Sequence, residues 1–159
     1  HRDPAMAAMT EWVLDCGNTA VKWAVFSGDA CLGHGVGLDE NALADSWGMP
    51  DGIAVAASGR VPESVASLKG RFPSARYAHL DAAAFQSVVR IDYAPAFGLG
   101  LDRWANVASA VNWDPEGAVV VIDAGTCLTM EVVHAGTLQG GSISPGFKMR
   151  LSSMSVGTA

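Results

Sequence analysis

The feature that most limits how this chain can fold is a short segment that occurs twice. Residues 14–22 have the sequence LDCGNTAVK, and residues 122–130 have the sequence IDAGTCLTM. Asp15 and Asp123 are 123 − 15 = 108 residues apart, and the match continues without a gap into the residues that follow. Each copy predicts a buried strand that ends in a carboxylate, a tight turn of small residues and a returning strand. We therefore expect a chain with two related halves.

The two predicted turns have the composition of a phosphate site. Backbone N–H groups and hydroxyls can hold phosphate oxygens, and the two carboxylates can hold a cation, directly or through water. One Asp-x-Gly turn is equally typical of an ordinary Asx turn. Two copies at matching positions are hard to explain in that way, so the repeat favours binding of a nucleotide phosphate. Lys22 lies on the strand that returns from the first turn and could reach a phosphate, although a single strand lysine is usually solvated.

Composition describes a globular chain with room for one domain and part of a second. Of its 159 residues, 50% are hydrophobic and 16% are charged. A net charge of −6 without a cluster of basic residues argues against a nucleic-acid partner. No apolar run is long enough to span a bilayer. Three cysteines without a C-x-x-C motif indicate a reducing compartment, so we expect a cytoplasmic protein with no membrane partner.

The rest of the pattern predicts three hairpin-connected strands followed by alternating helices and strands. Strands are expected over residues 11–15, 20–27, 30–36, 52–57, 75–80 and 118–122, and helices over residues 38–47, 62–71 and 81–86 and after Asp102. The apolar run 118–122 is typical of a strand buried on both faces, and residues 88–96 are expected to be extended. This order is that of the ribonuclease-H-like half of the actin-like ATPase fold, an α/β architecture.

The domain organisation follows from the repeat and from one strong turn signal. Residues 114–117 have the sequence DPEG, the clearest boundary in the chain. We expect residues 9–115 to form a first ribonuclease-H-like domain and residues 116–159 to start an incomplete second one. Residues 1–8 fit no periodic element and are interpreted as a remnant of a tag or vector.

Two consecutive charged residues, Asp102 and Arg103, follow the glycine-bearing loop 98–101. Asp102, taken alone, is best interpreted as a helix N-cap. Arg103 offers a planar fork suited to a carboxylate or a phosphate. A carboxylate near a hydroxyl can accept its proton while the oxygen attacks a γ-phosphate. The pair, with Tyr93 before it, would suit an alcohol that carries an anionic end. Residues 140–146 are interpreted as a loop and a helix start.

Together these motifs resemble the type III pantothenate kinase family. The resemblance is carried by residues 15–22, by Tyr93, by residues 100–103, by residues 123–126 and by residues 140–146, in matching order along nearly all of the chain. Other actin-like kinases share the Asp-x-Gly turns but not the Gly-x-Asp-Arg loop with a tyrosine before it.

The resemblance implies phosphorylation of pantothenate to 4′-phosphopantothenate, the first step of coenzyme A synthesis. It implies a homodimer that uses ATP with Mg²⁺ and a monovalent cation, K⁺ or NH₄⁺. The implied ATP-binding residues are Asp15, Cys16, Gly17, Asn18, Thr19, Ala20, Val21, Lys22 and Thr126. The implied pantothenate-binding residues are Tyr93, Gly100, Leu101, Asp102 and Arg103, with Asp102 as the catalytic base. Asp123 would coordinate the monovalent cation, and Asp15 would hold Mg²⁺, directly or through water.

The family's chains continue past the last residue of this one, with an adenine loop and much of the second domain. We therefore expect a fragment with weak or no activity by itself, because its second sheet would keep an open edge. One alternative is another actin-like small-molecule kinase, such as a sugar kinase. A second is a catalytically weak, nucleotide-binding regulator, and a third is an α/β domain whose repeated turns are only structural. The intact pair of Asp102 and Arg103 favours catalysis.

Overall fold

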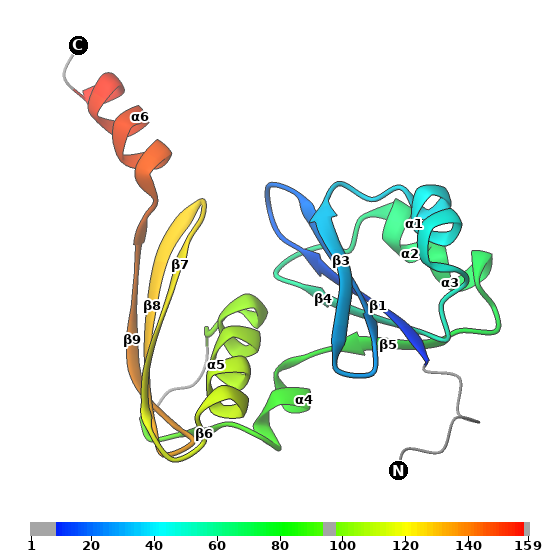
Figure 1. Cartoon of the computed structure of the whole chain (residues 1–159). Coiled ribbons are helices and arrows are strands. Elements are labelled where there is room, and N and C mark those ends of the chain that lie inside the picture. Colours follow the sequence, from blue (N-terminus) through cyan, green and yellow to red (C-terminus); the bar gives the residue numbers. More distant parts are fainter. Residues whose placement is uncertain (1–8, 94–97, 158–159) are drawn as a thin grey trace. The chain divides into compact units, whose positions relative to one another are not determined.

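The computed structural model describes residues 9–93 and 98–157 (Figure 1). They form two compact units, the first ending at Leu80 and the second beginning at Asp81. The domain boundary predicted after residue 115 marks the start of the second copy of the repeat and stays a prediction. The proposed vector remnant, residues 1–8, lies outside the described residues.

The first unit is a five-stranded mixed sheet in the order β3-β2-β1-β4-β5. Its strands are β1 (Thr10–Cys16), β2 (Val21–Ser27), β3 (Ala30–Val36), β4 (Gly52–Ala57) and β5 (Arg76–Leu80). Its helices are α1 (Glu40–Trp47), α2 (Glu63–Ala66) and α3 (Leu68–Arg71). The first three strands are antiparallel, whereas β4 pairs in parallel with β1 and with β5. All five predicted strands are confirmed, with shifts of one residue at some ends.

Alternation along β1 builds the core of the first unit. Trp12 and Leu14 are fully buried, and they share one cluster with Leu43 of α1 and Val65 of α2. The single helix predicted over residues 62–71 is instead two short helices. Ser67 lies between them as the C-cap of α2 and the N-cap of α3. Its hydroxyl donates to the carbonyl of Ser64, a local bond that competes with a continuous helix.

The second unit is a four-stranded sheet in the order β6-β9-β8-β7. Its strands are β6 (Arg90–Ile91), β7 (Ala118–Ala124), β8 (Cys127–His134) and β9 (Thr137–Pro145), and its helices are α4 (Ala82–Gln86), α5 (Leu101–Trp113) and α6 (Phe147–Gly157). Strands β7, β8 and β9 form an antiparallel meander like that of β1, β2 and β3. The predicted repeat is thus confirmed as a repeated structure. Of the extended segment predicted over residues 88–96, only β6 is a strand, and residues 94–97 lie outside the described part.

One face of the second sheet is packed against α5, which lies alongside the β7–β8 hairpin (Figure 1). Trp104 and Val107 of α5 are buried with Val133 and Leu138. The prediction that residues 118–122 are buried on both faces is wrong. Val120 and Ile122 are 56% and 64% exposed, whereas the alternate residues Val119 and Val121 pack against the core of the second unit.

The glycine-bearing segment 140–146 was predicted as a loop and is mostly strand. It belongs to β9, where each residue from 140 to 145 lies opposite a residue of β8. Pairing with β8 supplies hydrogen bonds that outweigh the low strand propensity of glycine. The predicted helix start is confirmed, since α6 begins at Phe147. Among the described residues, no helix is long and apolar enough to cross a membrane.

Candidate active site

The first repeated turn, residues 17–20, joins β1 to β2. It is closed by the N–H of Gly17, which donates to the carbonyl of Ala20 at 3.2 Å. Residues 17–19 are exposed. Asp15 lies directly opposite Lys22 in the ladder, and the Lys22 Nζ is 3.8 Å from Asp15 Oδ2. The turn therefore presents backbone groups, a hydroxyl, a carboxylate and an ammonium within one hairpin.

Cys16 separates Asp15 from this turn and points into the core. Its side chain is buried. Burial raises the pKa of the Cys16 thiol, and the negative charge of Asp15 raises it further. The pKa of Tyr77 is also raised, first by burial and then by the charge of Cys16. Cys16 is thus a neutral packing residue at neutral pH, and its contribution to a phosphate site is its backbone.

The second repeated turn, residues 125 and 126, joins β7 to β8 and is shorter than the first. The N–H of Gly125 donates to the carbonyl of Cys127 at 2.9 Å. Asp123 lies opposite Thr129, whereas an ungapped match to Asp15 and Lys22 would place Met130 there. The two hairpins therefore differ in register by one residue.

The glycine-bearing strand β9 ends against this second turn. The N–H of Gly146 donates to the carbonyl of Thr126 at 3.0 Å. A Cβ at Gly146 would collide with the carbonyl oxygens of Gly125 and Thr126, so only glycine permits this approach. Two motifs that were found separately in the sequence are thus in contact.

Asp102 lies in the first turn of α5 and is not the N-cap that its sequence position suggested. The N-cap is Gly100, and the helix begins at Leu101. Asp102 Oδ1 accepts the backbone N–H of Arg103 at 2.9 Å. This carboxylate also lies over Gly100, where a Cβ would collide with Oδ1. The Gly-x-Asp spacing therefore has a steric cause, and the helix N-terminus places positive potential beside the acid.

Arg103 is held by a residue that was not predicted from the sequence, Glu131 of β8. Arg103 Nε donates to Glu131 Oε1 at 2.5 Å, and the two side chains are 12% and 0% exposed. The second carboxylate oxygen lies 3.5 Å from the hydroxyl of Thr129. The guanidinium lies over Gly141 of β9, because a Cβ there would be 2.8 Å from Arg103 Nη2. The available signal was an acid inside the apolar strand segment MEVV, where only a paired carboxylate is stable.

The structure places the predicted site residues in two groups. Residues 15–22 belong to the first unit, and Tyr93, residues 100–103, Asp123 and Thr126 belong to the second. Tyr93 follows β6 and is 38% exposed. Residues 9–93 and 98–157 contain no cluster of three or more acidic, histidine or cysteine side chains that could hold a metal ion. A cation at either aspartate would therefore need further oxygen ligands from backbone carbonyls, hydroxyls, the nucleotide or water.

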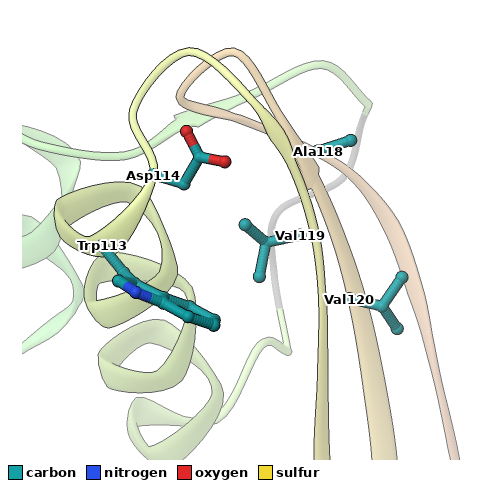
Figure 2. A pocket seen from close by; sticks show the side chains of 5 residues that line it. All are labelled: Trp113, Asp114, Ala118, Val119 and Val120. Atoms are coloured by element: carbon teal, nitrogen blue, oxygen red, sulfur yellow. The ribbon is translucent and has the colours of Figure 1, made fainter.

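An open groove of about 430 Å³ lies in the second unit, lined by Trp113, Asp114, Ala118, Val119 and Val120 (Figure 2). It is at the C-terminal end of α5, whereas Asp102 is in the first turn of that helix. A helix of 13 residues is about 20 Å long. The groove is therefore separate from the residues predicted to act on the substrate.

The strand order of the first unit and the repeated meander of the second define the class of protein. The fold is the α/β, ribonuclease-H-like fold of the actin-like ATPases. The crystal structure of a conserved putative Baf family transcriptional activator from Campylobacter jejuni has a similar fold. Its TM-score is 0.52 at 19% identity, over 91% of this chain and 59% of that chain.

Sequence comparison then identifies the family. The model of the type III pantothenate kinase family matches residues 12–159. The type III pantothenate kinase of Marinomonas sp. is 34% identical over 151 residues, which cover 92% of this chain and 61% of the relative. That of Halorhodospira halophila is 35% identical over 168 residues, covering 92% and 64%. The chain belongs to the type III pantothenate kinase family, and it spans less than two thirds of the length of these relatives.

Proposed function

We propose that the protein to which this chain belongs transfers the γ-phosphoryl group of ATP to the hydroxyl of pantothenate. The product is 4′-phosphopantothenate, the first intermediate of coenzyme A synthesis. The observation that carries this proposal is the carboxylate of Asp102, fixed at the start of α5 beside an anchored guanidinium, in a chain of this family.

Asp102 acts as the base. One of its oxygens, Oδ1, is engaged by the N–H of Arg103, which fixes the plane of the carboxylate. The other oxygen, Oδ2, accepts the proton of the pantothenate hydroxyl while the hydroxyl oxygen attacks phosphorus. Tyr93, Gly100, Leu101 and Arg103 hold pantothenate around that oxygen. Arg103 suits its carboxylate end, since a guanidinium binds carboxylates through two parallel N–H groups.

Each of the two repeated turns supplies groups that can bind a nucleotide phosphate. Residues 16–21, Lys22 and Thr126 contact the phosphates, and Asp15 and Asp123 provide hard oxygen ligands for cations. Mg²⁺ neutralises charge on the phosphates when it is bound. Asp15 faces the ammonium of Lys22, whereas Asp123 faces the hydroxyl-bearing Thr129. As the family resemblance implies, Asp15 would hold Mg²⁺, directly or through its water shell, and Asp123 would hold a monovalent cation, K⁺ or NH₄⁺. We further propose a cytoplasmic homodimer.

The test is ADP release by the full-length protein with ATP, Mg²⁺ and pantothenate, in K⁺, NH₄⁺ or Na⁺. We expect turnover with K⁺ or NH₄⁺ and a loss of about 10²-fold or more in kcat for Asp102→Asn, with the fold retained. Asp114→Asn is the matched control, because this acid lies at the other end of α5 and accepts only the N–H of Gly117 among the described residues. Full activity of Asp102→Asn would refute the assignment. Turnover only with other alcohols would indicate a different small-molecule kinase, and ATP binding without transfer would indicate a regulator.

A further inference from the structure

Glu131 is the one charged side chain that is fully buried among the described residues. A buried carboxylate is costly unless a cation and hydrogen bonds compensate it. Arg103 provides the cation at 2.5 Å, and the hydroxyl of Thr129 lies 3.5 Å from the other oxygen. The pair connects the first turn of α5 to the middle of β8, within a single compact unit.

The contact fixes both the position and the orientation of the Arg103 guanidinium. Its Nε edge faces Glu131, and its Nη2 lies over Gly141 of β9. The hydrogen bond to Glu131 uses Nε, one of the five N–H donors of the guanidinium, so the four Nη N–H groups remain available to bind an anion. The backbone N–H of the same residue holds Asp102 Oδ1. The Glu131 carboxylate therefore fixes the position of Arg103, which is the chain neighbour of the proposed base, Asp102.

Stability alone is a weak reason to retain such a pair. Replacing a buried ion pair with apolar residues of similar size is often neutral or stabilising. The first unit offers a contrast in Arg76 and Glu11, which form an ion pair at 3.2 Å with side chains 69% and 49% exposed. Exposed pairs of this type contribute little to stability. A buried pair beside Asp102 is more readily explained by the need to orient Arg103.

We propose that Glu131 is a positioning residue, which holds Arg103 so that its free N–H groups bind the carboxylate end of the alcohol substrate. This inference rests on the proposed function of Asp102 and Arg103. Glu131 does not contact the substrate and acts through Arg103.

The kinetic test uses Glu131→Gln in the full-length protein, with Glu11→Gln as the matched control. We expect KM for pantothenate to rise about tenfold or more while KM for ATP stays within twofold, because a charge-assisted hydrogen bond that orients the anion site is lost. In combination with Arg103→Lys, the effect should not add, since both changes disable one anion site. A purely structural role would lower kcat through the folded fraction and leave both KM values unchanged, and that result would overturn the proposal. Glu131→Asp, which keeps the charge, should give an intermediate KM.

A second measurement does not depend on activity. In the protein labelled with ¹⁵N at arginine Nε, the Arg103 Nε–H should give a downfield, slowly exchanging resonance, assigned by its absence in Arg103→Lys. This protection should disappear in Glu131→Gln and remain in Glu11→Gln. An unprotected Arg103 Nε–H in the wild type would overturn the pairing itself. A protected one in a wild type that does not phosphorylate pantothenate would reject the proposed function while confirming the pairing.

Discussion

The two meanders of this protein share one sequence pattern but bury opposite faces. In β1, Trp12 and Leu14 are fully buried, whereas the residues that match them in β7, Val120 and Ile122, are exposed. In β7 it is instead Val119 and Val121 that pack against the core. The same alternating pattern of apolar residues therefore allows a strand to bury either of its two faces.

The covering helices explain the inversion. In the first unit, α1 follows the third strand and buries Leu43 in the core beneath β1. In the second unit the covering helix is α5, which precedes the meander and packs on the other face. The helix that follows the third strand there is α6, which has no buried residue and continues beyond the end of β9 (Figure 1). A strand pattern thus predicts that one face is apolar, and the neighbouring helices decide which face is buried.

The largest expected effect tests this difference in burial directly. Leu14→Ala should lower the free energy of unfolding by about 2–5 kcal/mol, because it leaves a cavity in a closed core. The matching change Ile122→Ala should alter it by about 0.5 kcal/mol or less, since the side chain is mostly exposed. Urea unfolding of the 159-residue chain, followed by tryptophan fluorescence, measures both. Equal losses would mean that the face bearing Ile122 is covered.

A matched pair of glycines sharpens the comparison. Gly33 in β3 corresponds to Gly141 in β9, and each lies beneath a large side chain from a helix. Gly33 lies beneath the ring of Trp47 from α1, and Gly141 lies beneath the guanidinium of Arg103 from α5. In the first half the space above the glycine is filled by an aromatic ring. In the second half it is filled by the guanidinium of Arg103, which is the neighbour of the candidate base.

Alanine at these two positions should therefore have different consequences. Gly141→Ala should cost about 1–3 kcal/mol of unfolding free energy, because its Cβ meets the backbone carbonyl of Met130 as well as Arg103. It should also raise KM for pantothenate in the full-length protein. Gly33→Ala meets a side chain that can move, so it should cost less and leave that KM unchanged. An unchanged KM in Gly141→Ala would contradict the role given to Arg103.

The helices and strands of this chain can be predicted from its sequence more readily than the contacts between them. The bounds of β3 and β4 were predicted correctly because alternation and turn residues are local signals. The N-cap of α5 was not, since Gly100 and Asp102 both suit that position and only the folded loop selects one. The contact of Arg103 with Glu131 joins residues far apart in the chain, and no local spacing encodes it. The one-residue difference in register between the two hairpins could not be predicted either. An ungapped sequence match does not show which residues pair across each turn.

The smallest expected effect concerns the residue at the end of β1. Cys16 is buried there, whereas its counterpart at the end of β7 is the exposed Ala124. Folding raises the pKa of Cys16 above its ordinary value of 9.0. At a pH between these two pKa values, the folded chain therefore keeps the thiol proton, whereas the unfolded chain releases it. This contribution to stability is complete below pH 9.0 and is lost as the pH rises toward the folded pKa.

Between pH 9 and 10, Cys16 should therefore reduce the free energy of unfolding by at most about 1.4 kcal/mol per pH unit. Cys16→Ala places in the first copy the alanine found in the second and should remove this slope. Apart from Tyr77, whose pKa depends partly on the charge of Cys16, the other groups should titrate alike in both proteins. This pH range does not exceed the ordinary pKa of 10.0 for Tyr77, whose pKa is also raised in the folded chain. Urea unfolding at several pH values, compared between wild type and variant, measures the difference. Parallel curves would show that the Cys16 thiol titrates alike in the folded and unfolded chains, and that the end of β1 is as open as the end of β7.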